Sequence, residues 1–196
     1  YLEWSSPRRL SAEEQRSVPV KLTNPAFLRP FQRLVENFSI PQYGTVDPTP
    51  LVAIAYLLMF GLMFGDVGQG AVLLAIGVLG LMRNRRIGKP PGTLLPLFCW
   101  CGGAAMVSGT LFGSYFGRPW LPPLWFDYHG AVIGKSRGGL VSDISGILTI
   151  AIYFGVAVIA LGLLLNWVNL VRRREWLRLA LDKGGLVGGW MYGAGV

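Results

Sequence analysis

The chain of 196 residues is 52% hydrophobic and only 14% charged, whereas soluble domains usually carry about 25% charged residues. This composition excludes an ordinary soluble domain and favours a membrane protein with several spans. The net charge of +8 does not indicate nucleic-acid binding, because the basic residues are grouped between the apolar runs, notably at 83–89 and 172–183. The positive-inside rule predicts that both segments are cytoplasmic.

Residues 1–24 are polar and charged and precede every apolar run. We expect them to connect the membrane domain, residues 51–196, to a cytoplasmic domain that this chain lacks. The last apolar run begins at 184 and has only 13 residues, which are too few to cross a bilayer. We therefore expect the chain to be a piece of a longer multi-pass membrane protein with a cytoplasmic N-terminus.

Residues 25–50 predict an amphipathic helix followed by a proline-rich entry into the membrane. Phe31, Leu34 and Val35 recur at helical spacing after Pro30, a residue that helices tolerate at their start. Such a helix could pack on a soluble domain, but its position directly before an apolar run favours the membrane surface. Three prolines and a glycine in 40–50 then predict an extended segment.

Two apolar runs, 49–65 and 67–82, flank Asp66, the only charged side chain in residues 51–82. The runs could form one helix broken near Asp66. A continuous helix over 51–82 would extend about 48 Å, however, whereas the hydrocarbon core is about 30 Å thick. We therefore favour a transmembrane hairpin whose turn contains Asp66.

A bare carboxylate is costly in a membrane, so Asp66 needs a partner, a proton or water. Its position directly before the second run favours a structural role, in which the carboxylate caps that helix or accepts hydrogen bonds from backbone N–H groups of the turn. Gln69, one helical turn further, could extend a polar cluster. The alternative is a role for Asp66 in a proton path or in binding water.

The second half of the chain predicts a third span at 94–117, a fourth at 144–170 and the beginning of a fifth from 184. Gly109, Gly113 and Gly117 stand four residues apart and would line one face of the third span, where small residues permit close helix packing. The loop 118–143 is rich in aromatic residues and is predicted at the far membrane interface. The predicted fold is all-α, a polytopic membrane helical bundle of two transmembrane hairpins plus the beginning of a fifth span.

No motif in the chain predicts a catalytic residue, a metal site or a cofactor. GAVIGKS, residues 130–136, has one residue too few between its glycines for a phosphate-binding loop. His129, the sole histidine, has no evident partner to orient it as a general base, and we expect a solvated loop histidine. Cys99 and Cys101 have no further cysteine to complete a zinc site, so we expect them to pack as apolar residues.

Three motifs in residues 24–83 point to one family. They read N-P-x-x-x-x-P-F-x-x-L-V, Y-G-x-x-D-P-T-P and F-G-D-x-G-x-G, and their residues here are Pro25, Pro30, Phe31, Leu34, Val35, Tyr43, Gly44, Asp47, Pro48, Thr49, Pro50, Phe64, Gly65, Asp66, Gly68 and Gly70. Together they resemble the large membrane subunit of V-type and A-type rotary ATPases, called subunit a in eukaryotes and subunit I in prokaryotes. Gln69 departs from the family pattern, in which an aromatic residue or histidine is common.

The resemblance implies a non-catalytic stator subunit that takes part in proton or sodium translocation, while ATP is made or hydrolysed elsewhere in the complex. It implies the rotating proteolipid ring (subunit c/K), peripheral stalk subunits and membrane lipids as partners, and a prokaryotic plasma membrane as location. The family's essential arginine lies in later helices, so this chain would be the scaffold half. The alternatives are a small secondary transporter or channel in which Asp66 binds the coupling ion, and a membrane assembly protein without a transport role.

Overall fold

The computed structural model describes residues 22–38, 45–127, 129–130 and 144–195. Its helices are α2 (Arg29–Phe38), α3 (Thr49–Met63), α4 (Val67–Ile87), α5 (Leu94–Phe112), α7 (Ile144–Arg172), α8 (Trp176–Leu181) and α9 (Leu186–Ala194), and its strands are β1 (Ser114–Tyr115) and β2 (Arg118–Pro119). The described part is therefore mostly helical, as the composition predicts. The small β-hairpin was not predicted. Most of the predicted connector 1–24 lies outside the described residues.

Three described helices, α4, α5 and α7, are long and apolar enough to cross a membrane. Helix α3 is also apolar, but its 15 residues would extend only about 22 Å, less than a hydrocarbon core of about 30 Å. The helix in the predicted first span is thus shorter than expected. Helix α4 is longer, because it continues through most of the basic segment 83–89, where Arg85 and Arg86 complement the negative end of the helix dipole.

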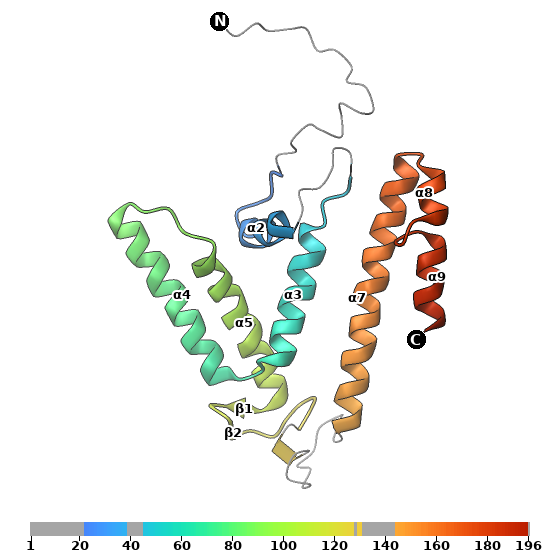
Figure 1. Cartoon of the computed structure of the whole chain (residues 1–196). Coiled ribbons are helices and arrows are strands. Elements are labelled where there is room, and N and C mark those ends of the chain that lie inside the picture. Colours follow the sequence, from blue (N-terminus) through green and yellow to red (C-terminus); the bar gives the residue numbers. More distant parts are fainter. Residues whose placement is uncertain (1–21, 39–44, 128, 131–143, 196) are drawn as a thin grey trace, which may run out of the picture.

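Helix α5 lies between α4 and α3, and α2 crosses one end of this group (Figure 1). Helices α3 and α4 run in opposite directions, as a hairpin requires, yet both pack mainly on α5 rather than on each other. The buried core is contributed by α2, α3 and α5 through Phe31, Ala53, Leu97 and Cys101. Helix α2 is therefore packed on the end of the bundle, and its predicted location at the membrane surface stays a prediction.

Glycines at seven-residue spacing form the contact between α4 and α5. They are Gly70 and Gly77 on α4, and Gly102 and Gly109 on α5. A Cβ added at Gly102 would lie 2.6 Å from the backbone nitrogen of Leu74, and one at Gly70 would lie 2.9 Å from the carbonyl oxygen of Gly102. The backbones of the two helices thus approach as closely as glycine permits, which is how membrane helices gain contact where lipid supplies no hydrophobic drive.

The stripe predicted at Gly109, Gly113 and Gly117 is wrong for its last two members, because only Gly109 lies in α5. Helix α5 ends at Phe112, and Gly113 follows it with a left-handed φ of 67°. Gly117, with a φ of 71°, lies in the loop of the β-hairpin. The apolar run continues past the helix end, so hydropathy alone could not place that end, whereas left-handed glycine is a common helix terminator.

Helix α7 stands beyond α3 (Figure 1), and within its apolar stretch no residue is buried by the described parts of the chain. The side chain of Asn169 accepts a hydrogen bond from the Val46 N–H at 2.9 Å, which links the end of α7 to the segment before α3. Asn166 and Trp167 donate to the carbonyl oxygen of Gly184 at 2.9 and 3.0 Å. These bonds hold the start of the last apolar run against α7. The run forms helix α9, as the sequence predicts.

Candidate functional site at Asp66

A short turn, Phe64–Asp66, joins α3 to α4. Asp66 has extended backbone angles (φ −141°, ψ 124°), and its Oδ1 accepts a hydrogen bond from the Gln69 N–H at 2.9 Å. This is an N-cap, in which a side-chain oxygen satisfies one of the free N–H groups of the first helical turn. The predicted capping geometry is confirmed. Gln69 takes part through its backbone, while its side chain lines a groove between α3 and α4.

The β-hairpin that follows α5 has a two-residue loop, Phe116 and Gly117, with Tyr115 paired to Arg118 across it. The φ angles of Phe116 and Gly117 are 50° and 71°. Hairpin loops of type I′ need positive φ at both central residues, a conformation that is uncommon for a bulky residue such as phenylalanine. The loop therefore depends on interactions that compensate for its conformation.

The carboxylate of Asp66 supplies these interactions and joins the hairpin to the helix turn. Its Oδ2 accepts hydrogen bonds from Ser114 Oγ at 2.8 Å and from the Gly117 N–H at 2.7 Å. Its Oδ1 accepts from the Phe116 N–H at 3.0 Å, in addition to the capping bond. The side chain is only 7% exposed. Because an ionised carboxylate has about four acceptor positions, the four donors use its full capacity.

Neutral dipoles, rather than a cation, balance the charge of Asp66. Among the described residues, no lysine, arginine or histidine forms an ion pair with it. Burial raises the pKa of Asp66, but the hydrogen bonds from Gln69, Gly117, Ser114 and Phe116 outweigh burial and hold the pKa below its ordinary value of 3.8. Asp66 lies in the turn outside both helices and is ionised at neutral pH.

Glycines next to Asp66 allow the hairpin and α5 to come this close. A Cβ at Gly65 would overlap the ring of Phe112, and a Cβ at Gly68 would overlap the ring of Phe116. On the α5 side, a Cβ at Gly109 would overlap the backbone nitrogen of Val67. The glycines of the F-G-D-x-G motif therefore make room for α5 and for the hairpin loop.

Further polar contacts extend from the hairpin into the loop behind it. His129 Nε2 lies 2.8 Å from the carbonyl oxygen of Gly117, the residue whose N–H bonds to Asp66. Asp127, only 2% exposed, accepts a hydrogen bond from the Gly130 N–H at 2.7 Å. His129 is half-buried and bonded to the hairpin, so it is less open to solvent than the expected loop histidine.

Aromatic side chains attach the same loop to the end of α5. The ring of Phe112 stacks on Trp125 at 5.7 Å and meets Phe126 edge-on at 6.1 Å. The carbonyl oxygen of Leu111 also accepts from the Trp125 N–H at 2.9 Å. Trp120 is instead 72% exposed, as an aromatic residue at a membrane interface would be. Only part of the predicted aromatic belt is therefore available to lipid.

The D-P-T-P motif, Asp47–Pro50, lies at the opposite end of α3 from Asp66. Asp47 Oδ1 accepts hydrogen bonds from the Thr49 N–H at 2.9 Å and Oγ at 2.6 Å, and Oδ2 accepts from Asn24 Nδ2 at 2.7 Å. Burial raises the pKa of Asp47, but these bonds lower it by more. Pro48 and Pro50 stand at the start of α3, where proline is tolerated. The motif residues that the structure describes thus form two clusters, one at each end of α3, whereas Tyr43 and Gly44 lie outside the described residues.

The cysteines belong to the packing of the bundle. Cys101 is buried in the core, and the thiol of Cys99 faces Gly77 across the contact between α4 and α5. In the part of the chain that the structure describes, no group of three His, Cys, Asp or Glu side chains could hold a metal ion. The GAVIGKS segment, apart from Gly130, lies outside the described residues.

Three of the four donors to Asp66 were missed by sequence reasoning, namely Ser114, Phe116 and Gly117. One local signal for them exists, because a two-residue loop that ends in glycine is typical of a tight hairpin. It was hidden inside an apolar run that reads as a helix.

Comparison with known proteins finds one matching family, and the similar proteins carry names of the same kind of subunit. Residues 5–96 match the V-type ATPase 116kDa subunit family. V-type ATP synthase subunit I 2 of Treponema pallidum (strain Nichols) is 33% identical over 189 residues, which cover 90% of this chain and 42% of the relative. A-type ATP synthase subunits I of Pyrococcus abyssi and Halobacterium salinarum are 31% and 30% identical, over 86% and 93% of this chain and 25% and 26% of their own lengths. The chain therefore spans less than half the length of these relatives.

Proposed function

Because this chain belongs to the V-type ATPase 116kDa subunit family, we propose that it is a scaffold in the static membrane part of a rotary ATP synthase or ATPase that translocates protons or sodium ions. The relatives are named as subunits I of ATP synthases. In this proposal the chemistry of ATP belongs to other subunits of the complex, and this chain contributes no catalytic residue.

The observation that carries the scaffold role is the fully occupied carboxylate of Asp66. It binds the first turn of α4 and the hairpin that ends α5, so it holds together the ends of two helices whose backbones are already in close contact. A coupling-ion site needs carboxylate oxygens that are free to bind the ion or a proton. The four donors leave no such position, which argues against a transporter or channel that uses Asp66.

Other parts of the complex are proposed as partners, namely the proteolipid ring and the peripheral stalk. Helix α7 supports such a partnership, because its apolar stretch is not buried by any described part of this chain. Lipid or neighbouring membrane helices must therefore surround it. We place the protein in a prokaryotic plasma membrane, with the basic ends of α4 and α7 on the cytoplasmic side.

Substitution of Asp66 in the complete complex tests this proposal. Asp66→Asn keeps one acceptor oxygen, and its amide can donate to Ser114 Oγ, but that amide opposes the Gly117 N–H. One unsatisfied buried donor should lower the stability of the protein by about 1–3 kcal/mol, so we expect less assembled complex. Each complex that does assemble should transport ions normally. Asp66→Leu leaves all four donors without an acceptor and should prevent assembly.

The measurement is ATP-driven acidification of vesicles, divided by the amount of assembled complex. Ser114→Ala is the matched control, because it removes one donor and leaves no donor unsatisfied, so both assembly and transport should be nearly normal. Assembled Asp66→Asn complexes that do not transport would refute the scaffold role and make Asp66 a carrier of the translocated ion.

A further inference from the structure

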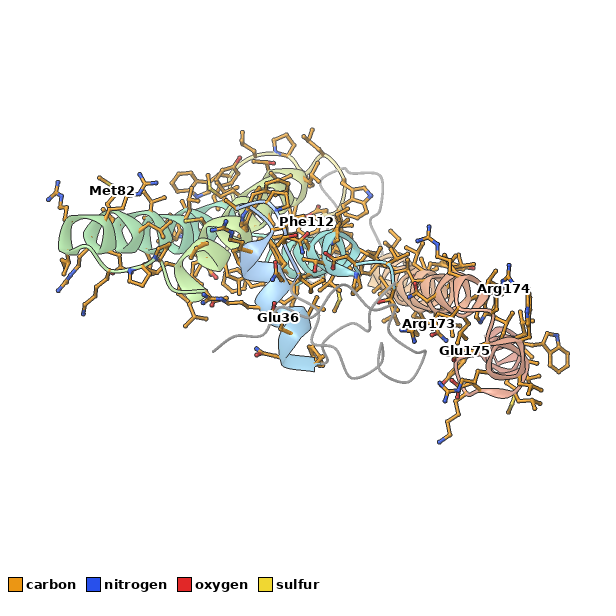
Figure 2. The ribbon with its side chains drawn as sticks, turned by 90° about the horizontal axis from the view of Figure 1, so that it is seen from above. Glu36, Met82, Phe112, Arg173, Arg174 and Glu175 are labelled. Atoms are coloured by element: carbon orange, nitrogen blue, oxygen red, sulfur yellow. The ribbon has the colours of Figure 1, made fainter. Side chains whose placement is uncertain are left out.

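A groove of about 290 Å³ lies at the basic end of α4, opposite to the Asp66 end. Its lining residues are Val78, Leu81, Met82, Asn84, Arg85, Lys89 and Pro91. Figure 2 shows Met82 near the outer end of α4, far from α7. Val78, Met82 and Arg85 follow one another at helical spacing on α4, and Lys89 joins them from the segment after the helix, so the lining changes along the groove from apolar residues to two cations.

A chain reversal at Gly88 brings the second side of this groove, Lys89 and Pro91, next to α4. Gly88 ends α4 in the left-handed region, with a φ of 69°, and its N–H and that of Lys89 bond to the carbonyl oxygens of Arg85 and Asn84 at 3.3 and 2.9 Å. The chain therefore turns back, and Lys89 and Pro91 come to lie against α4. The same bonds satisfy carbonyl groups at the helix end that would otherwise repel an anion.

The two cations of the groove have no acidic partner. Arg85 and Lys89 are exposed, and neither forms an ion pair with any described residue. Their positive charges lie directly beyond an apolar surface on a helix long enough to span the membrane. An anionic group with an apolar tail is complementary to this combination, whereas a free anion would leave the apolar part of the groove unused.

We propose that this groove is a binding site for an anionic phospholipid. The phosphate lies between the guanidinium of Arg85 and the ammonium of Lys89, and one acyl chain follows Val78, Leu81 and Met82. Arginine and lysine both donate strong charge-assisted hydrogen bonds to phosphate, and basic pockets at membrane helix ends attract anionic lipids. The proposal depends on α4 being in the membrane and is independent of the scaffold role of Asp66.

The test uses the complete detergent-solubilised complex and a phosphatidylglycerol with a photoreactive acyl chain. We expect crosslinks on residues 78–82, and labelling that falls about tenfold in the double variant Arg85→Gln, Lys89→Gln. The matched control is Arg83→Gln, Arg86→Gln, which makes the same change in charge on the same helix end outside the groove and should change labelling by less than about twofold. Met82→Trp fills the apolar part without changing charge and should also reduce labelling.

Two competitors distinguish a specific lipid site from unspecific bilayer contact and from a site for a free anion. A phosphatidylcholine with the same photoreactive chain should label residues 78–82 weakly, and millimolar inorganic phosphate should not compete. Equal labelling by both lipids, or equal losses in the two double variants, would overturn the proposal in favour of unspecific contact with the bilayer. Full competition by phosphate would overturn it in favour of a site for a free anion.

Discussion

The carboxylate of Asp66 shows how a single charged residue can be held in a largely apolar protein without a counter-ion. Its donors come from three places along the chain, namely the first turn of α4 at Gln69, the strand residue Ser114, and the hairpin loop at Phe116 and Gly117. Hydrogen bonds to a charged group contribute about 1.5–3 kcal/mol each. The side chain therefore acts mainly as an anchor between segments.

Acidification should remove the stabilisation that Asp47 gives to the start of α3. The pKa of Asp47 in the folded protein lies below its ordinary value of 3.8, so its contribution is present above about pH 4 and is lost as the pH falls through the folded-state pKa. In the detergent-solubilised complex, Asp47→Asn should melt a few degrees lower than the unchanged protein at pH 7. The two melting temperatures should converge below pH 4, and a difference independent of pH would contradict a role for the charge of Asp47.

The contacts of a single residue were predictable only where its partner is close in the sequence. The cap at Asp66 was predictable, because cap and helix start are adjacent in sequence. The donors Ser114, Phe116 and Gly117 follow about 50 residues later, and nothing local links them to Asp66. The contact of His129 was not predicted for the same reason, since its partner is the carbonyl group of Gly117 twelve residues earlier.

At the scale of elements, the pair α4 and α5 is the most closely packed part of the structure. Its contact surface consists of glycines seven residues apart on each helix, so backbone meets backbone along two turns. Helices α3 and α2 also pack on α5. This central helix carries the fully buried Ala105. Loss of the contact between α4 and α5 would therefore disturb every helix of the group.

Neighbouring glycines in α5 provide a direct test of this packing. A Cβ at Gly102 would lie 2.6 Å from the backbone of α4, whereas one at Gly103 would meet nothing within 4 Å. Gly102→Leu should reduce expression and lower stability by about 1–3 kcal/mol or more, as overpacking does. Gly103→Leu should be tolerated. Equal yields and melting temperatures for the two variants would show that α4 and α5 do not pack as described.

Element types were predictable here and element ends were not. The apolar runs placed α3, α4, α5 and α7 in the right order, because burial in a membrane requires such runs whatever the tertiary contacts. The hairpin β1–β2 and the end of α5 escaped prediction, since residues 113–117 keep the small and apolar composition of the helix before them. The left-handed φ at Gly113 is a property of the backbone that hydropathy does not report.

At the scale of the whole molecule, the two ends of the bundle have different characters. Helix α2, the end of α4 and the turn between α7 and α8 lie at one end in Figure 1, and the hairpin lies at the other. Basic residues gather at the first end, as the charge pattern predicts. The second end is held by Asp66 and by aromatic packing on Phe112.

Labelling with an impermeant thiol reagent tests the orientation that this polarity predicts. In a background where Cys99 and Cys101 are alanine, cysteine at Arg86 or Arg174 should be protected from reagent added outside intact cells. Cysteine at Trp120, whose side chain is 72% exposed, should react. The reverse pattern would invert the topology, and reaction at all three positions would contradict a membrane bundle with two distinct sides.

The bonds between Asp66 and the hairpin also determine the order in which contacts can form while the protein is being synthesised. Ser114, Phe116 and Gly117 follow Asp66 by 48, 50 and 51 residues, which a ribosome needs roughly 3–10 s to add at about 5–20 residues per second. During that interval α3 and α4 enter the membrane while the carboxylate has the cap bond alone. The remaining bonds to the carboxylate can form only after α5 has been inserted and the hairpin has closed, so in a nascent chain that stops before Ser114 three of its four acceptor positions lack their protein donors.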